Sequence, residues 1–329
     1  MKLPLSIAIG NYDRVRPLMD GTVQIDGVDP VFMNLEPEEI FFRAFRGIQF
    51  DVCELSLSSF AVKTAKGDNP YVGVPVFPSR MFRHSAFYIR KDRGIHSPAD
   101  LRGRRIGMPE YQLTACVWCR IILEEDHGIE PHEIRWVRGG IEHPGRIEKI
   151  SLNLPKNVVI EDIPAHRTLS EMLDAGEIDG VLGPRAPVGF ERGDTNIGWL
   201  FPDPQAAAKE YFRKSNIFPI MHVLGVKKTL VQQHPWLPAA LLKAFTKAKD
   251  LAVAALSATA ALQVSLPFSV ESAREARALI GDDFWSYGVS PNQHVLDTFL
   301  RHHHAQGLSS RRLHAEELFD PCTLESFKI

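Results

Sequence analysis

The stretch "FPSRMFRHS" at residues 77–85 carries two guanidinium groups and an imidazole, on Arg80, Arg83 and His84. It lies between two apolar runs that are typical of strands, and loops at strand ends are where folds present functional side chains. Arginine can donate two parallel hydrogen bonds to a carboxylate, and histidine exchanges protons near neutral pH. These residue types predict a carboxylate-binding loop with an adjacent proton-transfer group. The alternative interpretation is a solvated basic turn.

Three further groups that could bind an anion stand at the ends of predicted elements. Arg138 in "RWVRGG" and Arg185 in "GPRAPVG" each end an apparent strand. In "GMPEYQLTACVWC", Thr114 begins a predicted helix, where unpaired backbone N–H groups favour a carboxylate oxygen. For the two arginines the alternative is an ion pair at the surface or between lobes, and for Thr114 it is an ordinary helix cap.

Three of the thirteen histidines are candidates for proton transfer. His84, His143 in "GGIEHPGR" and His222 in "FPIMHVLG" fall at loops or strand ends, where they can face a cleft. A general acid or base needs a pKa near the working pH, and histidine has one. Residues 302–304, "HHH", fall on a helical pattern, and we expect them to form a solvated face.

Two glutamates are placed where they could assist a histidine. Glu54 in "CELSLSS" and Glu110 in "MPEYQ" can orient an imidazole or accept a proton, and the alternative is that they neutralise the arginines. Ser56 and Tyr111 can add hydrogen bonds to a ligand. We therefore expect Glu110 to take part in proton transfer, and Glu54, Ser56 and Tyr111 to bind the ligand.

Two closely spaced cysteines raise the question of a metal or redox site. Cys116 and Cys119 have the C-x-x-C spacing, but they fall inside a predicted helix and no second C-x-x-C exists. The sequence contains no H-E-x-x-H, G-x-G-x-x-G or Walker A pattern. We predict buried thiols, no metal and no cofactor. The alternative, a metal site built from the three candidate histidines and a carboxylate, has no local spacing to support it.

Length and charge limit the classes of partner. A chain of 329 residues is long enough for two domains. Its 38 Lys and Arg against 40 Asp and Glu give a net charge of −2, which provides no field to attract nucleic acid. No window offers the roughly 20 apolar residues that a membrane helix needs. The first residues are typical of a strand and not of an export signal. We expect a cytoplasmic protein with no nucleic-acid or membrane partner.

Short apolar runs alternate with helical patterns over much of the chain, which favours an α/β fold with largely parallel sheets. Strands are predicted at residues 5–9, 51–55, 72–77, 86–89, 105–108, 134–137, 158–160 and 179–182. Helices are predicted at residues 37–45, 114–127 and 169–175, and in the C-terminal third at 203–214, 236–258, 270–280 and 292–305. The long C-terminal helices offer a surface for a homo-oligomer.

The segment "HSPADLRGRRIG" at residues 96–107 combines a helix cap, a turn at Gly103 and the start of a strand. In this combination it resembles the crossover into the second lobe of type II periplasmic-binding-protein folds. The resemblance implies an α/β fold of two lobes with an interlobe cleft and a helical C-terminal region. Lobe 1 would comprise residues 1–92 and 224–329, and lobe 2 residues 93–223.

Five longer stretches narrow the resemblance. They read "VFPSRMFRHSAFYIRKD", "GMPEYQLTACVWCRIILEEDHGI", "RWVRGGIEHPGRIEK", "SNIFPIMHVLGVKK" and "DDFWSYGVSPNQHVLDTFLRHHHAQGL". Together they resemble the 4,5-dihydroxyphthalate decarboxylase family over nearly the entire chain. The family implies an intracellular enzyme of phthalate degradation that releases CO₂ from its substrate without a cofactor and forms protocatechuate. The alternatives are a cytosolic solute-binding protein for a small aromatic or dicarboxylate anion, and a different lyase on the same fold.

A substrate of this kind makes two demands on a site. Its adjacent carboxylates need cations, which the four candidate arginines can supply. Its decarboxylation needs a base that deprotonates the hydroxyl para to the leaving carboxylate, and an acid that protonates the ring carbon. On this resemblance, the histidines at positions 84, 143 and 222 would share the two proton transfers.

Overall fold

The computed structural model describes residues 2–150, 152 and 154–324. The chain divides into two compact units, and each contains its own β-sheet. Unit 1 comprises Met1–Arg80, Ile220–Asp297 and Leu313–Ile329. Unit 2 comprises Met81–Pro219 and Thr298–Arg312.

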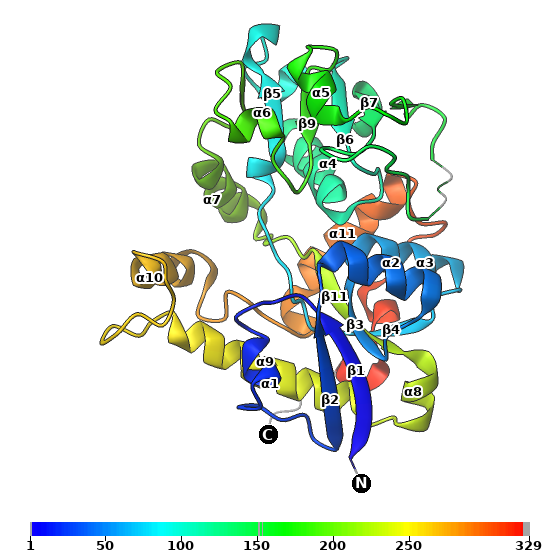
Figure 1. Cartoon of the computed structure of the whole chain (residues 1–329), viewed down its shortest axis with the longest axis vertical. Coiled ribbons are helices and arrows are strands. Elements are labelled where there is room, and N and C mark those ends of the chain that lie inside the picture. Colours follow the sequence, from blue (N-terminus) through cyan, green and yellow to red (C-terminus); the bar gives the residue numbers. More distant parts are fainter. Residues whose placement is uncertain (1, 151, 153, 325–329) are drawn as a thin grey trace. The chain divides into compact units, whose positions relative to one another are not determined.

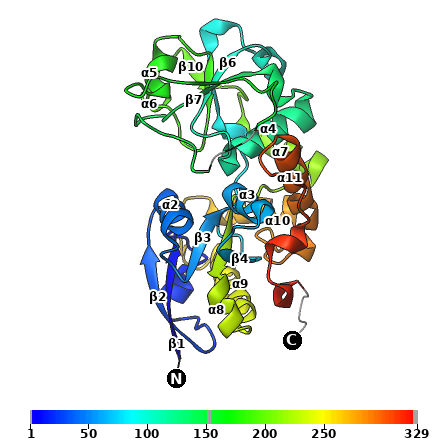
Figure 2. The same cartoon turned by 90° about the vertical axis from the view of Figure 1, so that its right-hand side faces the viewer.

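The sheet of unit 1 has the strand order β2-β1-β3-β11-β4. Its strands are β1 (Leu3–Ile9), β2 (Val28–Asn34), β3 (Val52–Ser56), β4 (Tyr71–Val74) and β11 (His222–Lys227). β1 pairs in parallel with β2 and β3, whereas β11 runs antiparallel to both β3 and β4. Figures 1 and 2 show β1 and β2 side by side at one edge of this sheet.

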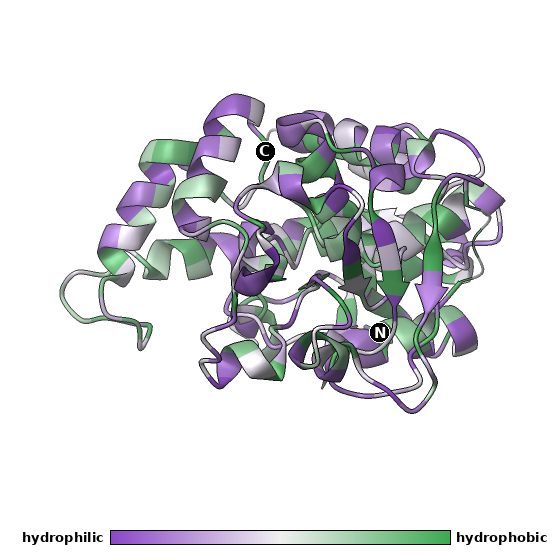
Figure 3. Cartoon of the chain, turned by 90° about the horizontal axis from the view of Figure 1, so that it is seen from above, coloured by the Kyte–Doolittle hydropathy of each residue, from purple (hydrophilic) through white to green (hydrophobic). Residues whose placement is uncertain are grey.

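Six α-helices lie wholly within the described part of unit 1, and several of them pack against this sheet. They are α1 (Arg16–Met19), α2 (Pro37–Gly47), α3 (Leu57–Lys66), α8 (Lys228–Gln233), α9 (Leu237–Ala255) and α10 (Ser269–Ile280). α2 and α3 pack against β3, and α9 packs against β4 and α1. In α2 the spacing of Ile40, Phe41 and Ala44 gives one buried face, as a helical period of 3.6 residues requires. The bands of hydrophobic and hydrophilic residues in Figure 3 show the same pattern along the helices.

The sheet of unit 2 has the strand order β10-β5-β9-β6-β7-β8. Its strands are β5 (Phe87–Arg90), β6 (Arg105–Met108), β7 (Arg135–Arg138), β8 (Ile160–Asp162), β9 (Gly180–Leu182) and β10 (Ile197–Trp199). β6, β7, β8 and β9 are parallel, and β5 is antiparallel to β9 and β10. The α-helices that begin in this unit are α4 (Thr114–His127), α5 (Leu169–Asp174), α6 (Val188–Glu191) and α7 (Pro204–Ser215).

Helix α11 (Gln293–Ala305) begins in unit 1 and ends in unit 2. Short 3₁₀ helices connect the larger elements: η1 (His84–Ala86), η2 (Lys91–Arg93), η3 (Pro98–Leu101), η4 (Pro131–Glu133), η5 (Ser290–Asn292), η6 (Ala315–Leu318) and η7 (Pro321–Thr323). η3 begins at Pro98, and the Asp100 carboxylate accepts hydrogen bonds from the backbone N–H and the hydroxyl of Ser97.

Several predicted features of the fold need correction. Most described strands of each sheet run in the same direction, as predicted, but both sheets are mixed, because β11 and β5 each run against their neighbours. The unpredicted elements are the strands β2, β10 and β11 and the helices α1, α3, α6 and α8. β2 contains a proline and lies at a sheet edge, where Pro is tolerated but the strand pattern is weak. The unit boundaries also differ from 92/93 and 223/224, since β5 pairs within the second sheet.

The prediction of a solvated face at residues 302–304 is wrong for two of the three histidines. His302 is 2% exposed and His303 is fully buried. The ring nitrogens of His302 contact Glu124 at 3.1 Å and Glu125 at 2.8 Å, both on α4. These contacts raise the pKa of His302 above its usual value although burial opposes the charge. The segment therefore packs into unit 2.

Cys116 and Cys119 are free and buried on α4, as predicted from their place in a helix. Burial raises the pKa of both thiols, which keeps them protonated at neutral pH. Within residues 2–150, 152 and 154–324, no helix combines the length and apolar character that crossing a bilayer demands.

Candidate active site

The pairing of β3 with β11 places three candidate side chains on one face of the unit 1 sheet. His222 lies directly opposite Ser56, and Leu224 lies opposite Glu54. Because side chains two residues apart on a strand share a face, Glu54, Ser56 and His222 point the same way. All of β3 is buried, so Glu54 is fully buried and His222, at the start of β11, lies at the edge of the covered region.

The carboxylate of Glu54 accepts three hydrogen bonds. The backbone N–H of Gly10 donates to Oε2 at 3.0 Å, and the Tyr12 hydroxyl donates to Oε1 at 2.7 Å. Nδ1 of His222 contacts the same Oε1 at 2.5 Å. Gly10 and Tyr12 come from the loop after β1, the strand next to β3. The loop and the two strands therefore fix the carboxylate in one position.

His222 is oriented by this carboxylate but remains accessible. Its side chain is 17% exposed. The ring of Phe41 on α2 packs edge-on against the imidazole, with the two ring centroids 4.8 Å apart. Because Nδ1 faces the carboxylate, the neutral imidazole carries its proton there and presents the Nε2 lone pair. Among the described residues Nε2 has no hydrogen-bond partner. This is the arrangement of a general base.

The electrostatics of the group fix its protonation state. Burial alone would raise the pKa of Glu54, but the charge of His222 and the hydrogen bonds from His222, Gly10 and Tyr12 outweigh it, so that pKa lies below its usual value. Burial and the charge of Glu54 raise the pKa of Tyr12. At neutral pH Glu54 is therefore a carboxylate and Tyr12 a neutral phenol that donates to it.

Arg14 is a residue of this region that the sequence did not single out. The central carbon of its guanidinium lies over the rings of Tyr12 and Trp285, at 4.3 and 4.2 Å from the two ring centroids. Nε donates to the carbonyl of Pro78 at 2.7 Å, and Nη2 donates to the same oxygen. Nothing in the local pattern "NYDRVR" indicated this role, because Trp285 and Pro78 are distant in sequence.

The predicted cluster of Arg80, Arg83 and His84 is divided between the two units. Arg80 belongs to unit 1, where its guanidinium donates to the carbonyl of Ser286 and to the side chain of Asn292. Burial lowers its pKa to about 9. Arg83 belongs to unit 2 and is 7% exposed, with Nη1 against the sulfur of Met81. Burial lowers the pKa of Arg83 as well. The solvated-turn alternative is also wrong, since all three side chains are buried.

His84, predicted to face a cleft, is buried in unit 2. It is 1% exposed and packs against the rings of Phe201 and Tyr211. Neither ring nitrogen has a hydrogen-bond partner in the described part of the chain. Burial lowers the pKa of His84 to about 4, so the imidazole is neutral in the folded protein at neutral pH.

This buried imidazole makes stability depend on pH. Between pH 4 and 6.5 the unfolded chain binds a proton at His84 and the folded chain does not, so stability rises with pH in this window. Above pH 6.5 His84 is neutral in both states and has no effect on the pH dependence. As the pH drops from 6.5 towards 4, the free energy of unfolding falls by about 3 kcal/mol. Urea unfolding at several pH values should show a shallower dependence for His84→Phe than for the wild type. The exposed-site control His96→Asn should keep the wild-type slope, and equal slopes in all three proteins would contradict the assignment.

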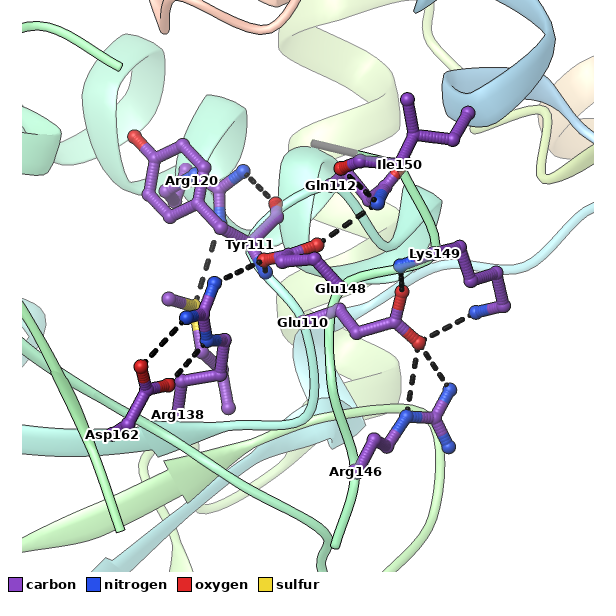
Figure 4. A network of polar contacts seen from close by, with 11 residues as sticks. Glu110, Tyr111, Gln112, Arg120, Arg138, Arg146, Glu148, Lys149, Ile150 and Asp162 are labelled. Carbon is purple, nitrogen blue, oxygen red and sulfur yellow. Dashed lines mark hydrogen bonds and ion pairs between the residues drawn. The ribbon is translucent and has the colours of Figure 1, made fainter. Parts of the chain in front are cut away.

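Figure 4 shows how the charged candidates of unit 2 are engaged. The predicted proton-transfer group Glu110 is 1% exposed and is neutralised by Arg146 at 2.7 Å and by Nζ of Lys149 at 2.6 Å. The structure therefore supports the alternative for Glu110, neutralisation by cations. The partners are Arg146 and Lys149, however, and not the arginines that were predicted to bind substrate.

The side chain of a second glutamate, Glu148, binds the turn before α4. It accepts from the backbone N–H of Tyr111 at 2.6 Å and from the side chain of Gln112 at 3.0 Å. Arg138 contacts Glu148 at 3.3 Å and forms a two-nitrogen pair with Asp162. The structure therefore supports the alternative for Arg138, an ion pair. The turn that was expected to bind an anion instead binds the carboxylate of Glu148.

The remaining candidates of unit 2 differ in exposure. Thr114 is the first residue of α4, as predicted, and is buried. The ring of Tyr111 is buried beneath the guanidinium of Arg120 at 3.7 Å. His143 and Arg185 are exposed, and in the described part of the chain their side chains have no partner. They are the unit 2 candidates that are available to a ligand.

Two further observations concern other kinds of site. A cavity of about 1170 Å³ in unit 1 is lined largely by α9 together with Trp236, Tyr287 and Cys322, but Glu54, His222 and Arg14 do not line it. In the part of the chain that the structure describes, no three His, Cys, Asp or Glu side chains are grouped to hold a metal ion. The group around Glu54 and His222 is therefore the candidate active site.

Comparison with solved structures gives the fold. The periplasmic aliphatic sulphonate binding protein SsuA from Escherichia coli is 12% identical, with a TM-score of 0.54, and the match covers 97% of this chain and 98% of that one. This similarity and the two mixed α/β units confirm the predicted two-lobed fold of the type II periplasmic-binding-protein class. No family model matches the chain.

Comparison with curated proteins gives the family. A protein of Comamonas testosteroni named 4,5-dihydroxyphthalate decarboxylase is 62% identical over 328 residues, covering 100% of this chain and 99% of the relative. A protein of Pseudomonas putida with the same name is 62% identical over 212 residues, covering 64% of this chain and 82% of the relative. The chain therefore belongs to the 4,5-dihydroxyphthalate decarboxylase family.

Proposed function

We propose that this chain removes one carboxylate of 4,5-dihydroxyphthalate as CO₂ and forms protocatechuate. The observation that carries the proposal is the 62% identity over the full chain to a relative with that name. The oriented His222 supplies the base that this reaction needs.

The chemistry sets the task of the site. Removal of the proton from the hydroxyl para to the leaving carboxylate pushes electron density onto the ring carbon that bears this carboxylate. That carbon then takes a proton, and the bond to the carboxylate breaks so that CO₂ leaves and the ring becomes aromatic again. The net reaction replaces a carboxylate with hydrogen and consumes one proton. The hydroxyl is weakly acidic, so the first step needs a base held in position.

We assign that first step to Nε2 of His222. Glu54 holds Nδ1 and stabilises the imidazolium that forms when Nε2 accepts the hydroxyl proton. Gly10 and Tyr12 hold Glu54, and the fixed carboxylate keeps the imidazole in the tautomer that can act as a base. Burial of Glu54 strengthens this interaction, because few water molecules screen it.

The proposal is tested with purified protein that has been treated with EDTA. Incubation with 4,5-dihydroxyphthalate should yield protocatechuate and CO₂ in equal amounts, measured by liquid chromatography and by CO₂ release. The controls are protein-free buffer and phthalate, which has no hydroxyl to deprotonate. Substrate that binds in calorimetry but persists, even after divalent metals are restored, would contradict the decarboxylase assignment and favour a binding protein or another lyase.

A further inference from the structure

We propose that Arg14 binds a carboxylate of the substrate and sets the specificity of the site for ring carboxylates. This inference rests on the proposed function, since it places the substrate's hydroxyl at His222. Arg14 replaces Arg80 in the role of the unit 1 cation, because Arg80 is buried against Ser286 and Asn292.

The hydrogen bonds of Arg14 leave a matched pair of donors. A guanidinium has five N–H groups. Nε and Nη2 each use one on the carbonyl of Pro78, and Nη1 uses one on Asp13 at 3.0 Å. One N–H therefore remains on each terminal nitrogen, and in the described part of the chain neither has a further partner. Two donors on neighbouring nitrogens fit the two oxygens of a carboxylate.

The surroundings hold the guanidinium in place without covering it. The rings of Tyr12 and Trp285 lie over it at 4.3 and 4.2 Å, so its plane is fixed. Trp285 is itself held by a hydrogen bond from its indole N–H to the carbonyl of Phe77 at 3.1 Å. The side chain of Arg14 is 15% exposed, so a ligand can reach its edge. A cation held in this way loses little side-chain entropy when it binds.

The position of Arg14 relative to the base matches the shape of the substrate. Tyr12 contacts both Arg14 and the partner of the base: its hydroxyl donates to Glu54, and its ring face contacts Arg14. The cation therefore lies against the face of the phenol whose hydroxyl donates to Glu54. In 4,5-dihydroxyphthalate the carboxylates lie across one ring from the hydroxyls. A substrate with a hydroxyl at His222 can therefore direct a carboxylate towards Arg14.

A buried phenol, Tyr287, follows two residues after Trp285 and has an unsatisfied hydroxyl within the described part of the chain. The hydroxyl of Tyr287 is buried and has no hydrogen-bond partner among the described residues. Burial raises the pKa of this phenol, and the charge of Arg14 acts against that rise. An unsatisfied buried hydroxyl is costly unless a ligand or water completes it.

The neighbouring Asp13 is the main competitor for the cation. It contacts Nη1, but its side chain is 47% exposed and it also accepts from the backbone N–H of Arg14. An exposed pair of this kind contributes little, because water screens it. A substrate carboxylate can therefore bind beside Asp13, and removal of the Asp13 charge should favour it.

The test measures binding without turnover. Calorimetry of the full chain with phthalate, which keeps both carboxylates but has no hydroxyl, should give about 10- to 100-fold weaker affinity for Arg14→Gln. Arg14→Lys, which keeps the charge but not the paired donors, should recover part of the loss. Asp13→Asn should bind phthalate as tightly as the wild type or more tightly. Catechol, which has no carboxylate, should bind all four proteins equally.

The outcomes separate this inference from the proposed function. Equal phthalate affinity in wild type and Arg14→Gln overturns the role of Arg14 even if decarboxylation is observed. A parallel loss of catechol and phthalate binding also overturns it, because it indicates a structural role. If the wild type does not decarboxylate 4,5-dihydroxyphthalate but phthalate binding still depends on Arg14, the proposed function fails and the carboxylate site stands. In an active enzyme, Arg14→Gln should raise KM more than it lowers kcat.

Discussion

The variant His222→Asn should lower kcat for 4,5-dihydroxyphthalate by about 10²- to 10⁴-fold, the range typical of a lost general base. The asparagine amide can still donate to Glu54, as Nδ1 does at 2.5 Å in the wild type, so the buried carboxylate keeps a partner. What is lost is Nε2, the atom that accepts the hydroxyl proton. His222→Ala is a less clean variant, because an unpaired buried carboxylate costs about 3–5 kcal/mol of stability.

The measurement is a steady-state assay combined with phthalate calorimetry. The expected pattern is a large loss of kcat with phthalate affinity close to that of the wild type, because phthalate has no hydroxyl to offer to residue 222. The matched control is His96→Asn, the same change at an exposed histidine of unit 2, which should leave kcat unchanged. Wild-type kcat in His222→Asn would remove His222 from the mechanism.

The second large effect should come from Glu54→Gln. Glutamine has the shape of glutamate, and its oxygen can still accept from the backbone N–H of Gly10, as Oε2 of the carboxylate does. Its NH₂ group, however, donates to Nδ1 of His222 and so places the imidazole proton on Nε2. In that tautomer Nε2 cannot accept a proton. The imidazolium also loses the carboxylate that stabilises it, so kcat should fall by about 10²- to 10⁴-fold.

Two measurements distinguish this effect from unfolding. Near-ultraviolet circular dichroism should show that Glu54→Gln remains folded, and phthalate affinity should stay near the wild-type value. The companion variant Tyr12→Phe removes one of the hydrogen bonds to Glu54 but keeps the carboxylate and the ring that stacks on Arg14. It should lower kcat by much less than Glu54→Gln. Equal losses in the two variants would indicate that Glu54 acts through the shape of the loop and not through the imidazole.

The sequence indicated the residue types of this site but not their pairing. Glu54 and His222 were both candidates, yet they are 168 residues apart and meet only because β11 inserts antiparallel beside β3. β11 was not predicted as a strand, so the register that sets His222 opposite Ser56 had no local signal. The helix beginning at Thr114 was predicted, because capping and periodicity are properties of neighbouring residues.

The errors have the same physical origin. Glu110 was predicted to take part in proton transfer. The cations that neutralise it, Arg146 and Lys149, follow 36 and 39 residues later, so no local pattern showed them. Arg80 and His84 suggested a cationic loop, but contacts with distant segments bury both. The family resemblance supplied the fold and the reaction, which periodicity and composition alone could not supply.

The way the chain is shared between the two units has a consequence for its synthesis. The chain passes between them at residues 80/81, 219/220, 297/298 and 312/313, so neither unit is a continuous piece. Arg120 on α4 donates to Gln306 at 2.8 Å, across 186 residues, and Glu124 contacts His302 across 178. On the ribosome, unit 2 cannot complete these contacts until almost the whole polypeptide has emerged. The partly made chain must therefore keep its unfinished core from aggregating until its last residues arrive.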